Sequence, residues 1–378
     1  MKLFFYSYIF LLVLSSNVIA APTIIPAPPA IDASSYLVLD YSSGKMIVEE
    51  NIDKRLPPAS LTKIMTTYVV ASELKEGNLS LEDEVLVSEK AWRTQGSRMF
   101  IEVGKRVTVD DLLHGVIIQS GNDASVALAE HISGTEGVFA DLMNKHAEKL
   151  GMKNTHYTNS TGLPDENHYT TARDLAILSR AYISNFPEIY KRNSIKEFTF
   201  NKIKQHNRNK LLWRDSSVDG IKTGHTDAAG YCLVASAERD DMRLISVVMG
   251  TSGANARAKA SQALLNYSFR FYESHKLYSA GETITSAPIW KADAKEINLG
   301  TDNDVHITVP RGQYEKLKPV VDIPADIIAP VNKGDKQGML NINLNDEVLL
   351  TIPLLALDSV SEGGFLTRMK DEIRLLIK

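Results

Sequence analysis

Hydrophobic and polar positions change their periodicity from region to region along the chain. Short apolar runs at residues 36–40 and 46–50 flank the polar turn Ser42-Ser43-Gly44, which predicts a β-hairpin. Apolar or β-branched runs at 231–237 and 244–249 predict two more strands. Apolar residues recur at helical spacing in five segments, namely 60–75, 110–132, 139–150, 172–183 and about 256–271. Strands that flank a largely helical middle predict an antiparallel sheet covered by helices, an α+β fold.

From about residue 275 the pattern becomes that of a small all-β domain. Segments 305–309 and 340–344 alternate apolar and polar residues, and Gly, Pro, Asn and Asp separate such segments. Few helical patterns appear before residue 360. We therefore expect a second, β-rich domain after the helical part.

The extreme C-terminus, residues 365–378, has the pattern of a separate amphipathic helix. Four cations and two anions lie opposite a set of apolar residues at helical spacing: Phe365, Leu366, Met369, Ile373, Leu376 and Ile377. Such a helix lies in a membrane interface and is attracted by anionic lipids, since about 14 residues are too few to span a bilayer. The alternative is a terminal helix packed on the β domain. Gly363-Gly364 favours a hinge, with the β domain as a stalk.

The first 20 residues have the pattern of a secretory signal peptide. Lys2 precedes an apolar run over residues 3–14, and the small-residue ending 18–20 follows a short polar stretch. A retained membrane anchor is the alternative, but the run is shorter than the roughly 20 residues that a spanning helix needs. We expect cleavage after residue 20 and a protein that works in a bacterial periplasm. Residues 21–30, rich in Pro and Ala, predict an extended arm.

The composition mainly excludes classes of protein and kinds of binding site. With 44% hydrophobic and 23% charged residues in 378, the chain is not of a disordered, collagen-like or coiled-coil class. The balance of 42 Lys and Arg against 46 Asp and Glu gives no electrostatic reason to expect a nucleic-acid partner. The single cysteine, Cys232, excludes an intrachain disulfide and a Cys-ligated metal site, and the nine histidines form no ligand pair. Without a glycine-rich phosphate motif either, we expect no metal and no cofactor.

Three Ser-x-x-Lys pairs offer a serine nucleophile with a base one helical turn away: Ser42/Lys45, Ser60/Lys63 and Ser72/Lys75. Ser42 falls in the predicted hairpin turn and Ser72 near the end of a helix, whereas Ser60 follows Pro57-Pro58-Ala59 and opens a helix. A helix N-terminus directs unpaired N–H groups and a positive partial charge at the site, which suits a developing oxyanion. Position therefore favours Ser60, although a plain N-cap is the simpler interpretation of that serine taken alone.

Two further motifs change this balance. Ser120-Gly121-Asn122 interrupts an apolar helical region, where polar groups must be satisfied locally or face a cavity, and Lys222-Thr223-Gly224 precedes the strand that begins at Tyr231. Taken singly, the first could be a turn between helices and the second a surface turn. In the order Ser-x-x-Lys, Ser-x-Asn, Lys-Thr-Gly, with separations of 60 and 102 residues, the three match the signature of penicillin-binding proteins and class A β-lactamases.

Over essentially its whole length the chain resembles the low-molecular-mass penicillin-binding proteins that are serine-type D-alanyl-D-alanine carboxypeptidases. The matching stretches are 58–63, 118–123, 207–213, 218–226 and 242–250. The resemblance implies an α+β catalytic domain with a five-stranded antiparallel sheet, a sandwich-like β domain, and removal of the terminal D-alanine from peptidoglycan pentapeptides. It also implies β-lactam inhibition.

These patterns and the resemblance together predict how the chain is divided and where it works. We expect a signal peptide at 1–20, a catalytic domain at 21–273, a β-rich domain at 274–357 and a membrane-anchoring helix at 358–378. The protein would be periplasmic and attached peripherally to the inner membrane through the lipid-binding helix. Its oligomeric state stays open.

Carried onto this chain, the resemblance implies that Ser60 is the acylated nucleophile and Lys63 its base. Ser120 would relay protons to the leaving amine, and Asn122 would hold the substrate amide. No metal role is expected for any of them.

The resemblance also implies that the strand formed by Lys222, Thr223 and Gly224 pairs with the extended peptide by β-augmentation. The backbone N–H groups of Ser60 and His225 would form the oxyanion hole. Arg257 would orient the free carboxylate of the substrate, with an exposed helix arginine as the alternative.

Two other functions share some of these features. A class A β-lactamase needs a deacylating glutamate in a Glu-x-x-Leu-Asn pattern, which does not occur between Asn122 and Lys222, and the order of Asp165, Glu166 and Asn167 in a nearby polar loop is wrong for it. A non-catalytic penicillin-binding sensor or scaffold would need a transmembrane link that the sequence does not indicate. Substrate strictness and endopeptidase or transpeptidase side activity stay open.

Overall fold

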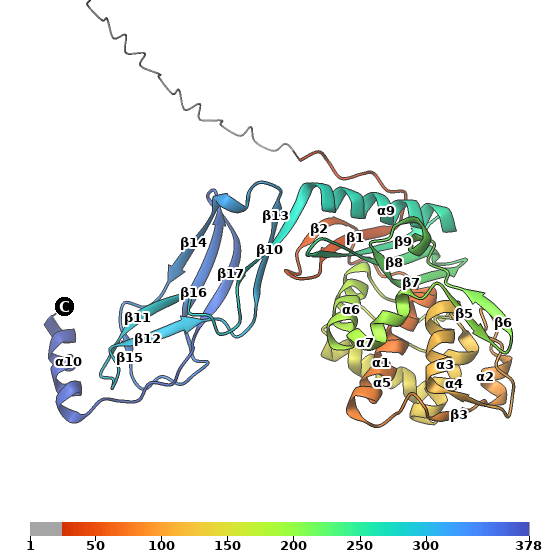
Figure 1. The fold of residues 1–378 in the computed structure, drawn as a ribbon, viewed down its shortest axis with the longest axis horizontal. Helices are drawn as coiled ribbons and strands as arrows, with labels where there is room; N and C mark the ends of the chain where they lie inside the picture. Colours follow the sequence, from red (N-terminus) through yellow and green to blue (C-terminus); the bar gives the residue numbers. More distant parts are fainter. Residues whose placement is uncertain (1–24, 378) are drawn as a thin grey trace, which may run out of the picture.

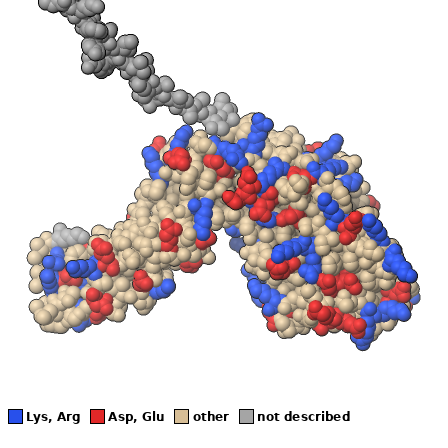
Figure 2. All heavy atoms as spheres, in the orientation of Figure 1, with Lys and Arg blue, Asp and Glu red and all other residues tan. Residues whose placement is uncertain are grey.

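A computed structural model describes residues 25–377, so the predicted signal peptide lies outside the described residues. Figure 1 shows a larger part built of helices around a sheet, an elongated β part beside it, and the C-terminal helix α10 at the far end of the β part. On the face drawn in Figure 2, basic and acidic side chains are interspersed over both parts.

The larger part is built on a five-stranded antiparallel sheet with strand order β2-β1-β9-β8-β7. The strands are β1 (Ser35–Asp40), β2 (Met46–Glu50), β7 (Val218–Thr226), β8 (Gly230–Arg239) and β9 (Met242–Thr251). The predicted N-terminal hairpin is β1 and β2, and the predicted strands at 231–237 and 244–249 are the middles of β8 and β9. The predicted α+β fold with a five-stranded sheet is thereby confirmed.

Helices cover both faces of this sheet because its strands are apolar on both sides. Leu37 and Leu39 of β1 belong to one hydrophobic cluster and Val38 to another, as the two-residue period of a strand requires. Helix α9 (Ala254–Phe271) packs on the Val38 face. On the other face lie α1 (Lys63–Glu76), α4 (Asn122–Ser133), α5 (Glu136–Lys149) and α6 (Ala172–Asn185).

Shorter elements complete this part. They are η1 (Ala59–Thr62), β3 (Glu84–Leu86), α2 (Glu89–Arg93), β4 (Arg106–Thr108), α3 (Val109–His114), η2 (Gly115–Gln119), α7 (Pro187–Tyr190), η3 (Lys191–Ser194), β5 (Glu197–Phe200), β6 (Ile203–His206) and α8 (Leu211–Arg214). The predicted helix 60–75 therefore begins as the 3₁₀ turn η1. The predicted helix 110–132 is divided into α3, the π-helical turn η2 and α4, with the break at the Ser-Gly-Asn motif.

The second part is all β, as the alternating pattern predicts. A six-stranded sheet has the order β14-β16-β17-β12-β11-β15, and β10 pairs with β13. The bounds are β10 (Tyr272–Tyr278), β11 (Thr285–Trp290), β12 (Glu296–Gly300), β13 (Val305–Pro310), η4 (Tyr314–Lys316), β14 (Leu317–Asp322), β15 (Ile327–Ile328), β16 (Lys336–Leu344) and β17 (Glu347–Ala356). Its own hydrophobic core includes Leu299, Leu340 and Leu354.

Helix α10 (Phe365–Ile377) exposes its apolar side chains. Phe365, Leu366, Met369, Ile373, Leu376 and Ile377 are each at least half exposed, up to 80% for Leu376. The polar side is held by the β part, where the backbone N–H of Lys291 donates to Asp371 Oδ2 at 2.8 Å and its ammonium pairs with Glu372. Among residues 25–377 no helix is long and apolar enough to cross a membrane.

The segment before α10 is attached to the same place. The N–H of Gly363 donates to the carbonyl of Lys291 at 2.8 Å, and a Cβ at Gly363 would lie 2.6 Å from the carbonyl oxygen of Ala292. Glu362 also forms a β-bridge with Ala292. Gly363 is thus a point of close approach to the β part, whereas the sequence favoured a hinge there.

Candidate active site

Ser60 and Lys63 lie together at the start of the first helix. Ser60 is in the turn η1, and Lys63 Nζ lies 3.2 Å from Ser60 Oγ. Lys63 is completely buried, and its Nζ also donates to Asn122 Oδ1 and to the carbonyl oxygen of Thr161, each at 2.6 Å. The residue before the serine, Ala59, has a φ of +47°, a strained conformation of the kind that concentrates at functional sites.

The other two Ser-x-x-Lys pairs have no such arrangement. Ser72 Oγ donates to Glu76 on its own helix at 3.2 Å. Lys45 is exposed in the hairpin turn, and no hydrogen bond joins it to Ser42 among the described residues. Among the three pairs, only Ser60 and Lys63 are in contact with a second motif.

Burial lowers the pKa of Lys63 to about 7, and the positive charge of Arg208 acts in the same direction. Asp123 and Glu136 act against this and raise the pKa. A lysine with a pKa near 7 is neutral in a large fraction of molecules at neutral pH, so this amine can accept a proton.

The Ser-Gly-Asn motif forms a tight turn beside this lysine. Ser120 has a left-handed backbone with φ of +65°, is 2% exposed, and its Oγ has no hydrogen-bond partner among the described residues. Asn122 Nδ2 donates to the carbonyl of Gln95 at 2.6 Å, which fixes the amide whose oxygen receives Lys63. A buried hydroxyl without a partner is rare in proteins, and here it lies in the motif next to Ser60 and Lys63.

Strand β7 forms the facing wall. Lys222 is 5% exposed, and burial first, then the charges of Lys63, Arg208 and Arg257, hold its pKa well below the ordinary value. At Gly224 a Cβ would lie 2.9 Å from the carbonyl oxygen of Pro58, so the strand passes close to the turn that carries Ser60. Glycine is needed for this approach.

Arg257 and His225 lie at the end of this strand. Arg257 is 8% exposed and donates from Nη1 to the carbonyls of Gly224, at 2.8 Å, and Cys232, at 3.3 Å. The alternative of an exposed helix arginine is therefore wrong. His225 is exposed, with its ring 3.9 Å from that of Tyr231 between centroids. Among residues 25–377 no group of three or more His, Cys, Asp or Glu could hold a metal ion.

Arg208 is a site residue that the motifs did not reveal. It lies just after β6, donates from Nε to the carbonyl of Gln119 at 3.0 Å, and lines a groove of about 610 Å³ together with His225, Tyr231 and Arg257. Phe100 and Lys210 also line this groove. We call it the carboxylate-side groove, because the cations that line it, Arg208, Lys210 and Arg257 among them, favour an anionic group.

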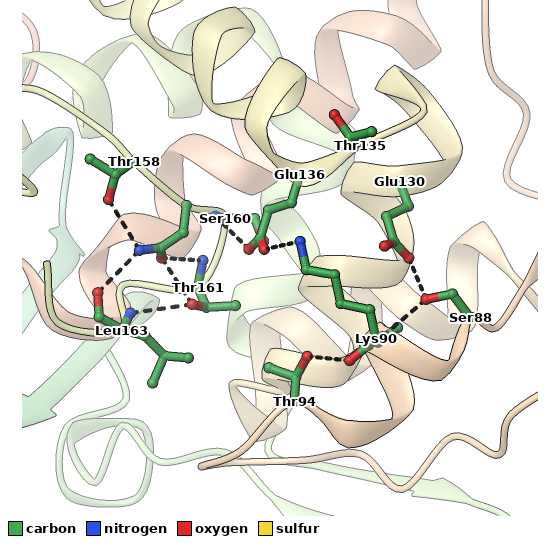
Figure 3. A network of polar contacts seen from close by, with 12 residues as sticks. Ser88, Lys90, Thr94, Glu130, Thr135, Glu136, Thr158, Ser160, Thr161 and Leu163 are labelled. Carbon is green, nitrogen blue, oxygen red and sulfur yellow. Dashed lines mark hydrogen bonds and ion pairs between the residues drawn. The ribbon is translucent and has the colours of Figure 1, made fainter.

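Residues 158–163 form a loop that fixes the acceptor for Lys63. Asn159 Oδ1 accepts from the backbone N–H groups of Thr161 and Gly162, at 3.1 and 2.8 Å. Ser160 donates from its backbone and its hydroxyl to Glu136 Oε1, and Glu136 pairs with Lys90 at 2.9 Å. Figure 3 shows this network between the loop and the neighbouring helices. The sequence signal for it is only a run of small polar residues.

His168 ties the same loop to the turn that carries Ser60. Its Nδ1 accepts from the N–H of Thr158 at 3.1 Å, so Nε2–H donates to Thr62 Oγ1 at 2.8 Å. Burial lowers the pKa of His168 to about 4, which keeps the ring neutral at neutral pH.

Comparison with known families identifies the family to which the chain belongs. Residues 23–253 match the family described as D-alanyl-D-alanine carboxypeptidase, and residues 272–362 match the C-terminal domain of penicillin-binding protein 5. The chain belongs to the D-alanyl-D-alanine carboxypeptidase family. It is a serine-type enzyme, a low-molecular-mass penicillin-binding protein, as the resemblance over its whole length implied.

Individual relatives agree over nearly the full length. The chain is 42% identical to D-alanyl-D-alanine carboxypeptidase DacA of Escherichia coli, over 94% of this chain and 90% of that protein, and 43% identical to DacC, over 97% and 93%. The crystal structure of penicillin-binding protein 5 from Haemophilus influenzae is similar with a TM-score of 0.87 and 43% identity, covering 89% of this chain and all of that one. These matches favour the carboxypeptidase over the class A β-lactamase and the non-catalytic scaffold.

Proposed function

We propose that Ser60 is the nucleophile of this carboxypeptidase and Lys63 the base that activates it. The observation that carries this proposal is the position of Lys63 Nζ, 3.2 Å from Ser60 Oγ and 2.6 Å from two fixed acceptors. A neutral amine donates its two protons to Asn122 and Thr161 and keeps its lone pair for the serine hydroxyl. A pKa of about 7 makes this neutral form available.

Acylation and hydrolysis follow from this geometry. Ser60 Oγ attacks the carbonyl carbon of the penultimate D-alanine of a peptidoglycan pentapeptide, and its proton passes to Lys63 Nζ. The C–N bond to the terminal D-alanine then breaks while a proton returns through Ser120 Oγ to the leaving amine. Water attacks the acyl carbon, again giving a proton to Lys63, and frees Ser60 and the shortened peptide.

The remaining motif residues hold the peptide. The backbone N–H groups of Ser60 and His225 stabilise the oxyanion, and the strand Lys222-Thr223-Gly224 pairs with the extended substrate. Asn122 Nδ2 has a second proton besides the one given to Gln95, and we assign it to the substrate amide.

The terminal carboxylate lies in the carboxylate-side groove. Arg208 and Arg257 are close enough to Lys222 to lower its pKa, and an anion relieves this concentration of positive charge. Because Arg257 already donates to two carbonyls of the sheet, it acts on the carboxylate mainly through its charge and by fixing β7, and Arg208 has more donors left.

β-Lactams acylate the same serine in this proposal. A β-lactam-bound structure supports it: that of penicillin-binding protein D2 from Listeria monocytogenes with ampicillin, which is 32% identical with a TM-score of 0.59. Deacylation is slow because the chain lacks the Glu-x-x-Leu-Asn pattern of class A β-lactamases.

We further propose that the enzyme works in the periplasm and binds the inner-membrane surface through α10. The exposed apolar side chains of that helix support this, as does the contact of its acidic residues with Lys291, which turns the apolar face away from the β part. The proposed units are 21–273, 274–357 and 358–378, after removal of 1–20.

Truncation tests the anchor. Because Val360 and Glu362 form β-bridges with the β part, we expect a protein ending at Gly364 to keep its fold and its activity but to lose binding to vesicles that contain anionic lipid. Ending at Asp358 removes both bridges and should also lower the melting temperature. Sedimentation with vesicles measures the first effect, and continued binding of the Gly364-terminated protein would refute the anchor.

The enzymatic proposal is tested with diacetyl-L-Lys-D-Ala-D-Ala. We expect the protein from Ala21 onward to release D-alanine, and expect prior treatment with penicillin or the substitution Ser60→Ala to abolish the release. Ser42→Ala and Ser72→Ala are the matched controls and should keep it. Release that survives in Ser60→Ala but not in a control would overturn the assignment.

A further inference from the structure

Strand β6 and the segment that follows it lead from the edge of the larger part into the carboxylate-side groove (Figure 1). Between residues 204 and 210 exposed side chains alternate with buried ones, so that Gln205, Asn207 and Asn209 point inward. Lys202, in the turn before β6, is exposed as well. We call the exposed set the basic row, and it consists of Lys202, Lys204, His206, Arg208 and Lys210.

The buried side chains hold this segment in place. Gln205, Asn207 and Asn209 each donate from the side-chain amide to a backbone carbonyl of a different segment, at 3.0, 3.0 and 2.8 Å. In the turn, Asn201 and Lys202 both have a positive φ, +46° and +64°, as a two-residue type I′ turn requires. The side chains of the basic row therefore start from a fixed backbone.

The basic row brings more positive charge to the carboxylate-side groove than one carboxylate needs. Among the described residues that line the groove there is no Asp or Glu, and there are four cations, namely Lys204, Arg208, Lys210 and Arg257. In the proposed function, on which this inference rests, the terminal carboxylate of the substrate lies beside Arg208 and Arg257, and one or two such cations match a carboxylate. At about 3.3 Å per residue, Lys204 is roughly 13 Å along the chain from Arg208, out of reach of that carboxylate.

Little in the protein neutralises the outer end of the row, Lys202 and Lys204. Lys202 has no hydrogen bond or ion pair among residues 25–377. Lys204 forms an ion pair with Glu197 on β5, whose carboxylate also lies 3.8 Å from His206 Nδ1. Both partners of this ion pair are largely exposed, and such a pair contributes little to stability, so Lys204 stays available to an incoming anion.

The peptide that reacts with Ser60 cannot supply this anion, because it ends at the carboxylate beside Arg208. The other pentapeptides of the same peptidoglycan strand each end in a free carboxylate as well. We propose that the outer end of the basic row binds the carboxylates of these neighbouring pentapeptides and so holds the polymer while one peptide is cleaved. Two attachments to one polymer raise the effective concentration of the next peptide, which lowers KM and leaves kcat unchanged.

Glycan strands that carry many pentapeptides, and the single disaccharide pentapeptide released from them, test this proposal because both present the same reacting bond. At about 50 mM salt we expect the wild-type kcat/KM for D-alanine release, per pentapeptide, to be about 10-fold higher on the strands, and about 500 mM salt should remove this preference. The double variant Lys202→Gln, Lys204→Gln should lower the preference to about 2-fold or less, a few-fold for each exposed pair lost, with no change on the single unit.

Glu197→Gln should move the preference in the opposite direction. It frees Lys204 from its ion pair, so we expect the preference for strands to rise by about 2- to 3-fold. Opposite effects within one hairpin separate binding from loss of the fold. The control Lys145→Gln, Lys149→Gln removes the same charge from exposed positions of α5 and should keep the wild-type preference.

Equal kcat/KM on strands and single unit at low salt, or a preference that persists in the Lys202 and Lys204 double variant, would overturn the inference. If that variant keeps the preference and instead loses binding to vesicles that contain anionic lipid, the row contacts the membrane and the inference is wrong. If the wild type releases D-alanine from neither substrate, the proposed function itself fails.

Discussion

The pH dependence of acylation follows from the burial of Lys63. Burial, helped by Arg208, lowers the pKa of Lys63 from 10.5 to about 7. This fall corresponds to about 5 kcal/mol of differential interaction between the charged and neutral forms. At pH 7 about half of the molecules hold a neutral Lys63, against about 0.03% for an ordinary lysine, so the usable base increases by roughly 10³-fold.

The assay is the second-order rate constant for acylation by penicillin between pH 5 and pH 10. Below pH 7 we expect the rate to rise tenfold per pH unit, so that at pH 5 it is about 100-fold below a plateau reached above pH 7. Lys63→Arg keeps a charge that does not titrate in this range and should be about 10²- to 10⁴-fold slower throughout, with a thermal melt to check its fold. A wild-type profile that is flat, or that has its midpoint near pH 10, would refute the role of Lys63 as base.

Three further predictions use other parts of the site. Ser120→Ala should change the unfolding free energy by no more than about 0.5 kcal/mol, since its Oγ has no partner, yet slow D-alanine release by about 10²-fold or more. A loss of rate that is accompanied by a matching loss of stability would contradict the relay. Gly162→Ala should destabilise by at least about 2 kcal/mol in urea, because its Cβ would lie 1.8 Å from a carbonyl oxygen, whereas Gly151→Ala, with open space around it, should cost about 1 kcal/mol. Glu136→Gln removes a charge that raises the pKa of Lys63, so the midpoint of the pH profile should move to lower pH; a move upward would count against it.

The architecture was accessible from the sequence because periodicity encodes it directly. The hairpin, the two-residue alternation of the β part and the amphipathic helix over the described residues 365–377 all appear where the pattern predicts them. The break at Ser120-Gly121-Asn122 was also visible, since polar residues interrupt an apolar helix. The 3₁₀ turn that carries Ser60 was not, because a 3₁₀ turn and an α-helix start with the same residues.

The parts of the site that the sequence did not reveal act through backbone atoms or through long-range charge. Thr161 contributes a carbonyl oxygen, which every residue has, so no residue type could indicate it. Arg208 and Glu136 reach Lys63 from distant segments, and only the fold brings them near. Asp165 and Glu166 were predicted to lie in a polar loop, but only the fold shows that they line the same groove as Arg55.

The most direct test of the account is the site of the penicillin adduct. The three candidate serines fall in different tryptic peptides: Ser60 in residues 56–63, Ser72 in 64–75, and Ser42 in a peptide that ends at Lys45. Mass spectrometry of the acylated protein should find the added mass of the penicillin on peptide 56–63, located at Ser60 by fragmentation and absent in Ser60→Ala. An adduct on either of the other peptides, or an adduct that persists in Ser60→Ala, would contradict the assignment of the nucleophile.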